Sequence, residues 1–288
     1  MNHPRRTFLK TSLAATAAAA FSGRSHAAAS GAAPAREYYD LRCYWLKSDP
    51  QGRTPARLKS AVNPALLDSY LEKALVPALA KRGAGPVGVF TEIEVNKNAG
   101  TSAPKADSPV WVLIPYSSLE AFVTVSAEVN ADAAVRQAAA AYLNVPKAAP
   151  AFERVDSWLL RAFKSMPKLE QPAFSKTKSP GRVFEMRDYE SHSEAAALNK
   201  MAMFDDGETE VMRDLGMSPV FFGQALSGPN LPHLRYFTSG PDLAAHLAAW
   251  KKFGPDPRWV KMKDDPKYAN NTSRNTARFL VPKAFSQL

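Results

Sequence analysis

Cysteine is almost absent from this chain of 288 residues, which contains Cys43 and no other. A single thiol cannot form a disulfide within the chain, although oxidising compartments permit one. Cys43 lies in an apolar run with the composition of a β-strand. This context predicts a buried, unreactive side chain and not a nucleophile. The lack of disulfides suits a protein that folds in a reducing compartment.

Histidine is scarce, and the usual catalytic motifs are missing. The sequence has no GxxxxGK[ST] phosphate loop, no GxSxG serine elbow, no HExxH and no CxxC pair. Beyond residue 30 only His192, His233 and His246 occur, far apart and without clustered carboxylates. A structural zinc ion needs four nitrogen or sulfur ligands, so this distribution does not predict one. We therefore expect neither a metal nor a cofactor.

The three histidines have different expected positions. His246 falls on the apolar stripe of a predicted helix, which is typical of a buried histidine with a hydrogen-bond partner. His233 begins a predicted strand after a proline, where we expect it at the surface. His192 follows the first strand of the second half of the chain, and we treat it as a candidate ligand-binding residue. The residues around His192 also fit a helix N-terminus, with Ser191 or Ser193 as the cap and Glu194 in the first turn.

Long runs of one residue class are also absent. Beyond residue 29 no apolar run is long enough to span a bilayer, so we expect no stable membrane insertion. Removal of residues 1–27 would take away four basic residues and no acid, which lowers the formal charge from +10 to +6. The remaining basic residues are dispersed and are not interleaved with aromatic residues. This pattern predicts no nucleic-acid partner.

The N-terminus carries an export signal. Arg5-Arg6-Thr7-Phe8-Leu9-Lys10 has the twin-arginine pattern, and the short alanine-rich apolar run Leu13–Phe21 follows it. Small residues at Ser25-His26-Ala27 and at Ala27-Ala28-Ala29 offer two cleavage sites. We predict a twin-arginine signal peptide over residues 1–29 and a mature protein in the periplasm or outside the cell. Because this route carries folded proteins, the chain must fold before export.

An internal repeat organises the rest of the chain. Tyr39-Asp-Leu-Arg-Cys-Tyr44 and Phe184-Glu-Met-Arg-Asp-Tyr189 share the order aromatic, acid, aliphatic, arginine, any residue, tyrosine. After each motif the periodicity predicts a helix, two strands, a second helix and a closing strand. Asn63-Pro64 is typical of a helix start in the first half, and we expect Asp205-Asp206-Gly207 to interrupt the corresponding helix of the second half. The order β-α-β-β-α-β is that of a ferredoxin-like unit. We therefore predict repeats at 36–165 and 181–288, joined by a linker rich in proline, lysine and serine at 166–180.

Each such unit covers one face of its sheet with its own helices and leaves the other face bare. We predict an α+β fold in which the two units pack sheet to sheet as an intramolecular dimeric α+β barrel. Alternation along the first strand of each unit then separates an apolar face from a polar one. We expect the apolar residues to pack on helices and the polar ones to point between the sheets. The polar set gives the candidate cavity and ligand-binding residues: Asp40, Arg42, Tyr44, Glu185, Arg187 and Tyr189, with His192 at the rim.

Buried charges need partners, so two interpretations of this polar set remain open. In the first, acid and arginine form ion pairs that hold the strand register. In the second, the same residues line a ligand cavity.

These residues carry a family resemblance. Three segments resemble the NIPSNAP family: Glu185 to Glu194, Pro219-Val-Phe-Phe-Gly223, and Trp250 to Trp259. The first half matches through Tyr39 to Tyr44, Pro86 to Phe90 and Val112 to Tyr116. The chain is most similar to exported bacterial members with two tandem repeats and a twin-arginine signal. The resemblance implies a dimeric α+β barrel fold. It implies no catalytic residues, because none are established for the family.

Two functions follow as hypotheses. The residues favour a non-catalytic small-molecule-binding or structural protein, whose partner would be a small-molecule ligand and which leaves a homo-oligomer open. The alternative is an enzyme similar to cofactor-free or haem-dependent monooxygenases, with its site in the cavity between the sheets. The contents of that space would discriminate between the two.

Overall fold

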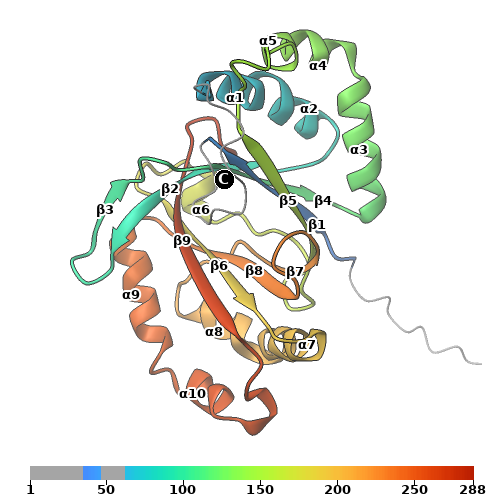
Figure 1. Ribbon diagram of the computed structural model, residues 1–288. Coiled ribbons are helices and arrows are strands. Elements are labelled where there is room, and N and C mark those ends of the chain that lie inside the picture. The colour runs from blue at the N-terminus through green and yellow to red at the C-terminus, as the bar shows by residue number, and fades with distance from the viewer. Residues whose placement is uncertain (1–34, 47–61) are drawn as a thin grey trace, which may run out of the picture. The chain divides into compact units, whose positions relative to one another are not determined.

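The strands of the described residues form one antiparallel sheet that closes on itself (Figure 1). The computed structural model describes residues 35–46 and 62–288, so the predicted signal peptide at 1–29 lies outside the described residues. The sheet and all the helices named below belong to the unit Pro34–Leu288.

The first half follows the predicted order of elements. Asn63 caps the first helix by accepting a hydrogen bond from the backbone N–H of Ala65, and Pro64 is its first residue, as the sequence predicts. The hairpin strand β3 and the short helices α4 and α5 are additions that periodicity did not predict. The elements are β1 (Tyr38–Trp45), α1 (Pro64–Tyr70), the π-helical segment η1 (Leu71–Leu75), α2 (Val76–Lys81), β2 (Gly88–Asn96), β3 (Thr101–Pro104), β4 (Val110–Tyr116), α3 (Leu119–Ala131), α4 (Ala133–Ala138), α5 (Ala140–Leu143) and β5 (Arg154–Ala162).

The second half has the same order. Ser193 caps α7 and Glu194 lies in its first turn, which confirms the helix N-terminus predicted beside His192. The short helices α6 and α10 are additions to the predicted set. The elements are α6 (Ala173–Lys176), β6 (Val183–Glu190), α7 (Glu194–Met203), the π-helical segment η2 (Phe204–Glu208), α8 (Thr209–Asp214), β7 (Phe221–Ser227), β8 (His233–Gly240), α9 (Leu243–Phe253), α10 (Pro257–Lys263), the 3₁₀ turn η3 (Pro266–Tyr268) and β9 (Arg274–Pro282).

Two strand pairings join the halves into a barrel-like sheet. The strand order is β3-β2-β4-β1-β5-β7-β8-β6-β9, and β2 also pairs with β9. The first junction aligns Leu160 of β5 with Ala225 of β7. The second runs from Phe90 opposite Pro282 to Ile93 opposite Phe279. The predicted α+β barrel is therefore confirmed at the level of a closed antiparallel sheet with helices outside it, and its halves meet edge to edge.

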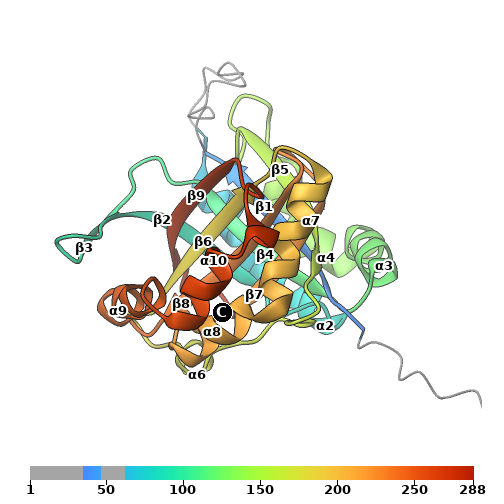
Figure 2. The same cartoon turned by 90° about the horizontal axis from the view of Figure 1, so that it is seen from below.

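Helices cover the outside of this sheet in two groups. Figure 1 shows α1 to α5 on one side of the strands and α7 to α10 on the other. Seen from below, α10 lies between α7 and α9 (Figure 2). None of the described helices combines the length and the hydropathy needed to cross a bilayer. The segment predicted as a linker contains α6 and the fully buried Met166, so it packs against the fold.

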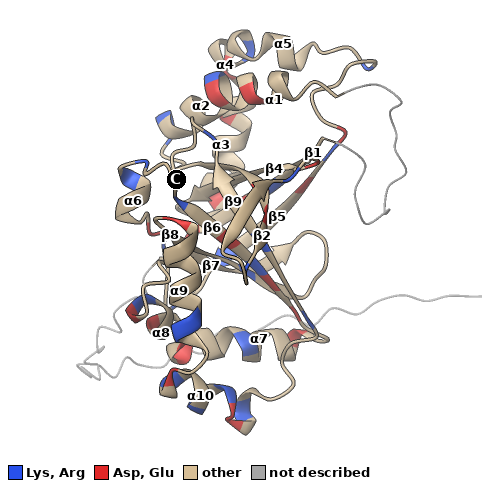
Figure 3. Cartoon of the chain, turned by 90° about the vertical axis from the view of Figure 1, so that its left-hand side faces the viewer, with Lys and Arg blue, Asp and Glu red and all other residues tan. Residues whose placement is uncertain are grey.

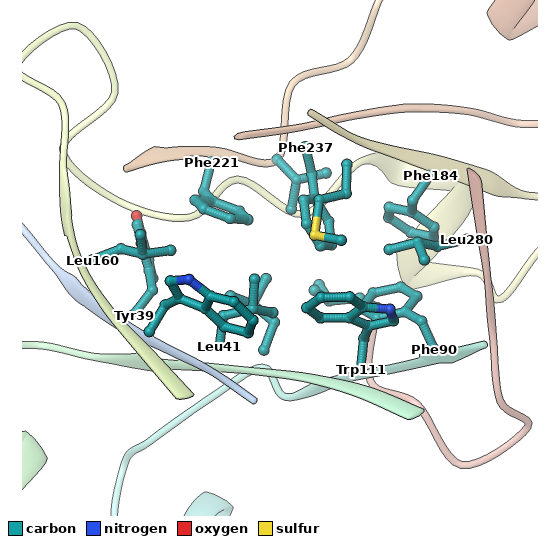
Figure 4. Close-up of a cluster of buried hydrophobic side chains, with 14 of the residues drawn as sticks. Tyr39, Leu41, Phe90, Trp111, Leu160, Phe184, Phe221, Phe237 and Leu280 are labelled. Carbon is teal, nitrogen blue, oxygen red and sulfur yellow. The ribbon is translucent and has the colours of Figure 1, made fainter. Parts of the chain in front are cut away.

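Aromatic and aliphatic side chains fill the interior of the barrel (Figure 4). Rings from opposite halves touch there, with centroid distances of 4.8 Å for Tyr39 and Phe221 and 5.0 Å for Phe90 and Phe184. Cys43 belongs to this cluster, and burial raises the pKa of its thiol well above the usual value. The predicted buried, unreactive cysteine is therefore confirmed.

The predicted assignment of strand faces was wrong. Tyr39, Leu41 and Cys43 point into the barrel, not toward helices, and so do Phe184 and Met186. The polar residues of the same strands lie on the face that the helices cover. The physical reason is that the bulkier apolar face buries more surface between the sheets, while charged side chains can reach partners and solvent beneath the ends of helices. The placement between the sheets fails for Asp40, Arg42, Tyr44, Glu185, Arg187 and Tyr189.

Candidate functional site

The polar residues of β1 form a paired group beneath the helices of the first half. The Arg42 guanidinium lies 2.7 Å from the Asp40 carboxylate, which also accepts a hydrogen bond of 2.6 Å from Ser157 on β5. Burial disfavours the charged form of Arg42, but its acid partner outweighs that effect and raises its pKa. Tyr44 packs edge to face on Phe152. These contacts support the ion-pair interpretation for the first half.

The corresponding residues of β6 form a larger network. Glu185 is fully buried, and its carboxylate lies 2.9 Å from Arg187 Nη1, 2.8 Å from His246 Nε2 and 3.5 Å from Lys97 Nζ. Burial alone would raise the pKa of Glu185, but the hydrogen bond from His246 and the charge of Arg187 lower it to about 2. The carboxylate is therefore ionised and shared by three donors.

Arg187 extends this network along the strand. Its guanidinium lies 4.6 Å from the Trp250 ring centre and donates a hydrogen bond of 3.3 Å to the hydroxyl of Tyr189. That hydroxyl is 2.9 Å from the hydroxyl of Tyr236. Both arginines are thus mostly buried and paired with acids, as predicted, although the predicted location was wrong.

The structure also tests where the three histidines were expected to lie. His233 was expected at the surface, but it is only 1% exposed. Its Nδ1 lies 3.0 Å from the carbonyl oxygen of Asn230, and burial together with the nearby Arg235 lowers its pKa to about 4. His192 is exposed in the loop before α7. His246 is buried and bonded, as predicted. No group of three or more potential metal ligands comes together among the residues that the structure describes.

One end of the barrel interior is charged, which the sequence analysis missed. Asp188 lies opposite Arg235 across the β6–β8 ladder and accepts hydrogen bonds of 3.0 Å from Arg235 Nη2 and from Arg278 Nη1. Burial would raise the pKa of Asp188, but the two guanidiniums outweigh it and lower the pKa. Nearby, Glu92 accepts a hydrogen bond of 2.9 Å from the Trp111 indole and pairs with Lys105.

A sequence signal for this end existed. Arg278 lies two positions from Leu280 on β9, and Glu92 lies two positions from Phe90 on β2. Residues two positions apart point to the same face of a strand, so each charged residue shares a face with a core residue. A charge on a buried face requires a partner, and that requirement could have singled these residues out.

The charged end reaches the surface at a pocket between β2 and β9. The two strands pair as far as Ile93 and Phe279, and beyond that point β2 turns away to pair with β3, as the projecting hairpin in Figure 1 shows. The pocket left between them has a volume of about 540 Å³. We call it the seam pocket. Its polar and charged lining residues are Glu92, Glu94, Lys97, Lys105, Thr276 and Arg278.

The seam pocket adjoins both polar networks. Lys97 reaches Glu185 on the outer face of the sheet, and its ammonium lies 5.1 Å from the Phe279 ring centre. Arg278 and Lys105 approach from the interior network, where Arg278 Nε lies 3.7 Å from Glu92. Figure 3 shows the acidic and basic residues interspersed on the strands. The pocket is therefore the place where charged side chains of both strand faces meet solvent.

The second half of the chain also carries the sequence pattern of a known family. Residues 184–287 match the NIPSNAP family model. The NIPSNAP match includes β6 with Glu185, Arg187 and Tyr189, as well as α9 and β9. It does not extend to residues 36–165, whose resemblance stays a prediction. Residues 3–22 match the signal sequence of the twin-arginine translocation pathway, so the protein is exported to the periplasm or secreted. A search of curated proteins gives no match for this chain.

Several solved structures are similar to this chain. A proposed monooxygenase from Lactobacillus acidophilus is 7% identical, with 86% of this chain and 94% of that chain covered and a TM-score of 0.49. A proposed monooxygenase from Fusobacterium nucleatum is 12% identical, with coverage of 86% and 93% and a TM-score of 0.46. A NIPSNAP-like domain protein from Burkholderia xenovorans is 16% identical over 37% of this chain and 89% of its own, with a TM-score of 0.33.

Proposed function

We propose that this exported protein is a non-catalytic small-molecule-binding protein whose seam pocket takes a small anion, such as a carboxylate or a phosphate. The observation that carries the proposal is the approach of three basic side chains, those of Lys97, Lys105 and Arg278, to one pocket of about 540 Å³. This volume lies within the range of small-molecule sites.

The three basic residues have donors left for a ligand. An ammonium group has three N–H donors and a guanidinium has five. Lys97 and Lys105 each pair with one carboxylate, and Arg278 pairs with Asp188 and Glu92. Three basic and two acidic residues line the pocket, so its own charges favour an anion. Partial burial would strengthen such an interaction relative to a fully exposed one.

The alternative enzyme, with its site between the sheets, has weaker support. Side chains such as Tyr39, Phe90 and Trp111 occupy the space where a substrate would bind. The basic partners of Glu185 and Asp188 lower the pKa of both carboxyl groups, which suits structural pairing better than proton transfer.

Isothermal titration calorimetry at low salt tests the anion site, with inorganic phosphate, acetate, succinate and benzoate as probes. We expect binding of at least one probe, weakened by about tenfold in Lys97→Met and in Lys105→Met, which corresponds to ~1.4 kcal/mol each. Arg274→Met is the matched control, because Arg274 lies on β9 outside the pocket and should leave the affinity unchanged. A lack of binding for all four probes, or an equal loss in Arg274→Met, would overturn the proposal.

We also propose that residues 36–165 and 181–288 are two ferredoxin-like repeats of the NIPSNAP type. Two features support this. Without the added hairpin strand β3, each half has four strands. Their order in the sheet is β2-β4-β1-β5 in the first half and β7-β8-β6-β9 in the second. Both halves therefore place their strands in the order second, third, first, fourth. In addition, the first long helical region of each half contains a π-helical segment, η1 or η2.

A further inference from the structure

A second pocket lies on the helical side of the second half, away from the seam. It is a groove of about 340 Å³ between α7, the end of β7 and the start of β8. We call it the α7 groove. Its lining residues are Glu194, Ala197, Leu198, Met201, Gln224, Ala225, Leu226, Leu231, Pro232 and His233.

The walls of the α7 groove are unusually apolar for an exposed surface. Leu198, Leu226 and Leu231 have 54%, 41% and 48% of their surface exposed, and all three line this one groove. Single exposed leucines are ordinary, but three gathered around a hollow form a patch that gains free energy when an apolar molecule covers it.

The charge that lines the groove is acidic. Glu194 brings a carboxylate from the first turn of α7. No lysine or arginine lines the groove. This distinguishes it from the seam pocket and from the basic character of the chain as a whole. The charge of the groove therefore complements a cation.

We propose that the α7 groove binds a hydrophobic amine. The apolar part of the amine would cover the three leucines, and its ammonium group would meet Glu194. This site is independent of the seam pocket, and it favours a ligand of the opposite charge.

A matched ligand series tests this proposal on the mature protein. The probes are n-octylamine, 1-octanol and octanoate below their aggregation concentrations, which share one chain and differ in charge. Binding is followed by calorimetry and by NMR of labelled leucine methyl groups. We expect octylamine to bind at least tenfold more tightly than octanol, and octanoate to bind least. Methyl shifts should centre on Leu198, Leu226 and Leu231, and spare the equally exposed Leu119 and Leu143.

Two variants separate a specific site from general charge attraction. Glu194→Gln should lower the affinity for octylamine to that for octanol. Glu120→Gln is the control, because Glu120 also lies in the first turn of a helix, α3, behind the capping Ser118. Both changes leave their helix caps intact, so both variants should fold. Equal binding of octanoate and octylamine, equal shifts at Leu119 and Leu143, or equal losses in the two variants would each overturn the proposal.

Discussion

Arg187 illustrates how this fold keeps a charge beneath a layer of helices. Arginine cannot lose its proton to escape burial, so it must be paired where it lies. Its partner Glu185 has two more donors, His246 and Lys97, and the Trp250 ring covers the guanidinium. Arg42 and Asp40 repeat the arrangement with fewer partners. These pairs support a structural role for the acid–arginine motif in both halves.

A double-mutant comparison at this pair checks that role. We expect Arg187→Met to lower the free energy of unfolding by about 2–3 kcal/mol, because it removes one of the three donors to a buried carboxylate. Adding Glu185→Gln should recover part of that loss, since a neutral amide needs no counter-charge. Urea denaturation measures both variants. A double variant that loses the full sum of the two single losses would contradict the structural role. Unchanged stability of Arg187→Met with loss of anion binding would instead make the residue part of a ligand site.

The helical regions that follow β1 and β6 show how an interruption is accommodated in an element. Pro77 lacks the N–H for a regular helical bond, and the π-helical segment η1 lies directly before α2, which contains it. In the second half, Asp205-Asp206-Gly207 was predicted to interrupt the helix. The structure confirms this, because Gly207 has a φ of 143° inside η2. A Cβ atom at Gly207 would also lie 3.1 Å from Cε of Met262.

Gly207→Ala should therefore destabilise the protein by about 1–2 kcal/mol, through backbone strain and a tight contact with α10. Gly254→Ala is the control. Gly254 has ordinary helical dihedrals, and no atom lies within 4 Å of the place its Cβ would take. This second change should be neutral or stabilise by up to about 1 kcal/mol. Thermal unfolding compares the two, and equal effects would contradict the strain at η2.

At the scale of the whole molecule, closure of the barrel joins distant parts of the chain. β2 pairs with β9, and β5 pairs with β7, so the sheet closes only after the last strand is available. The backbone N–H of Val87 and of Val89 also donate to side chains near the C-terminus, those of Gln287 and Ser286. An export route that carries folded proteins suits such a topology, because a chain translocated segment by segment would have to assemble the barrel afterwards.

Replacement of Arg5-Arg6 by Lys-Lys should leave the folded, unprocessed protein in the cytoplasm, because the route recognises the twin arginine. Cell fractionation and the mass of the product measure this. Arg24→Lys, a conservative change outside the recognised pair, should leave export and removal of the signal intact. Undiminished export of the Lys-Lys variant would contradict the assignment.

The sequence by itself determined the export signal, the order of the main strands and helices, the helix starts at Asn63 and Ser193, and the interruption at Gly207. These depend on local chemistry: capping side chains, apolar periodicity and backbone freedom. It also predicted that Arg42 and Arg187 would be paired with acids, since neither can be buried alone.

Only the tertiary structure decided which face of each strand points into the barrel. Period-two alternation separates two faces, but both faces are buried here, one by helices and one by the opposite sheet. Burial alone therefore cannot tell them apart. The convergence of Lys97, Lys105 and Arg278 depends on the β2–β9 junction, which joins residues almost 190 positions apart. The burial of His233 likewise depends on its neighbours in space, which its local sequence does not specify.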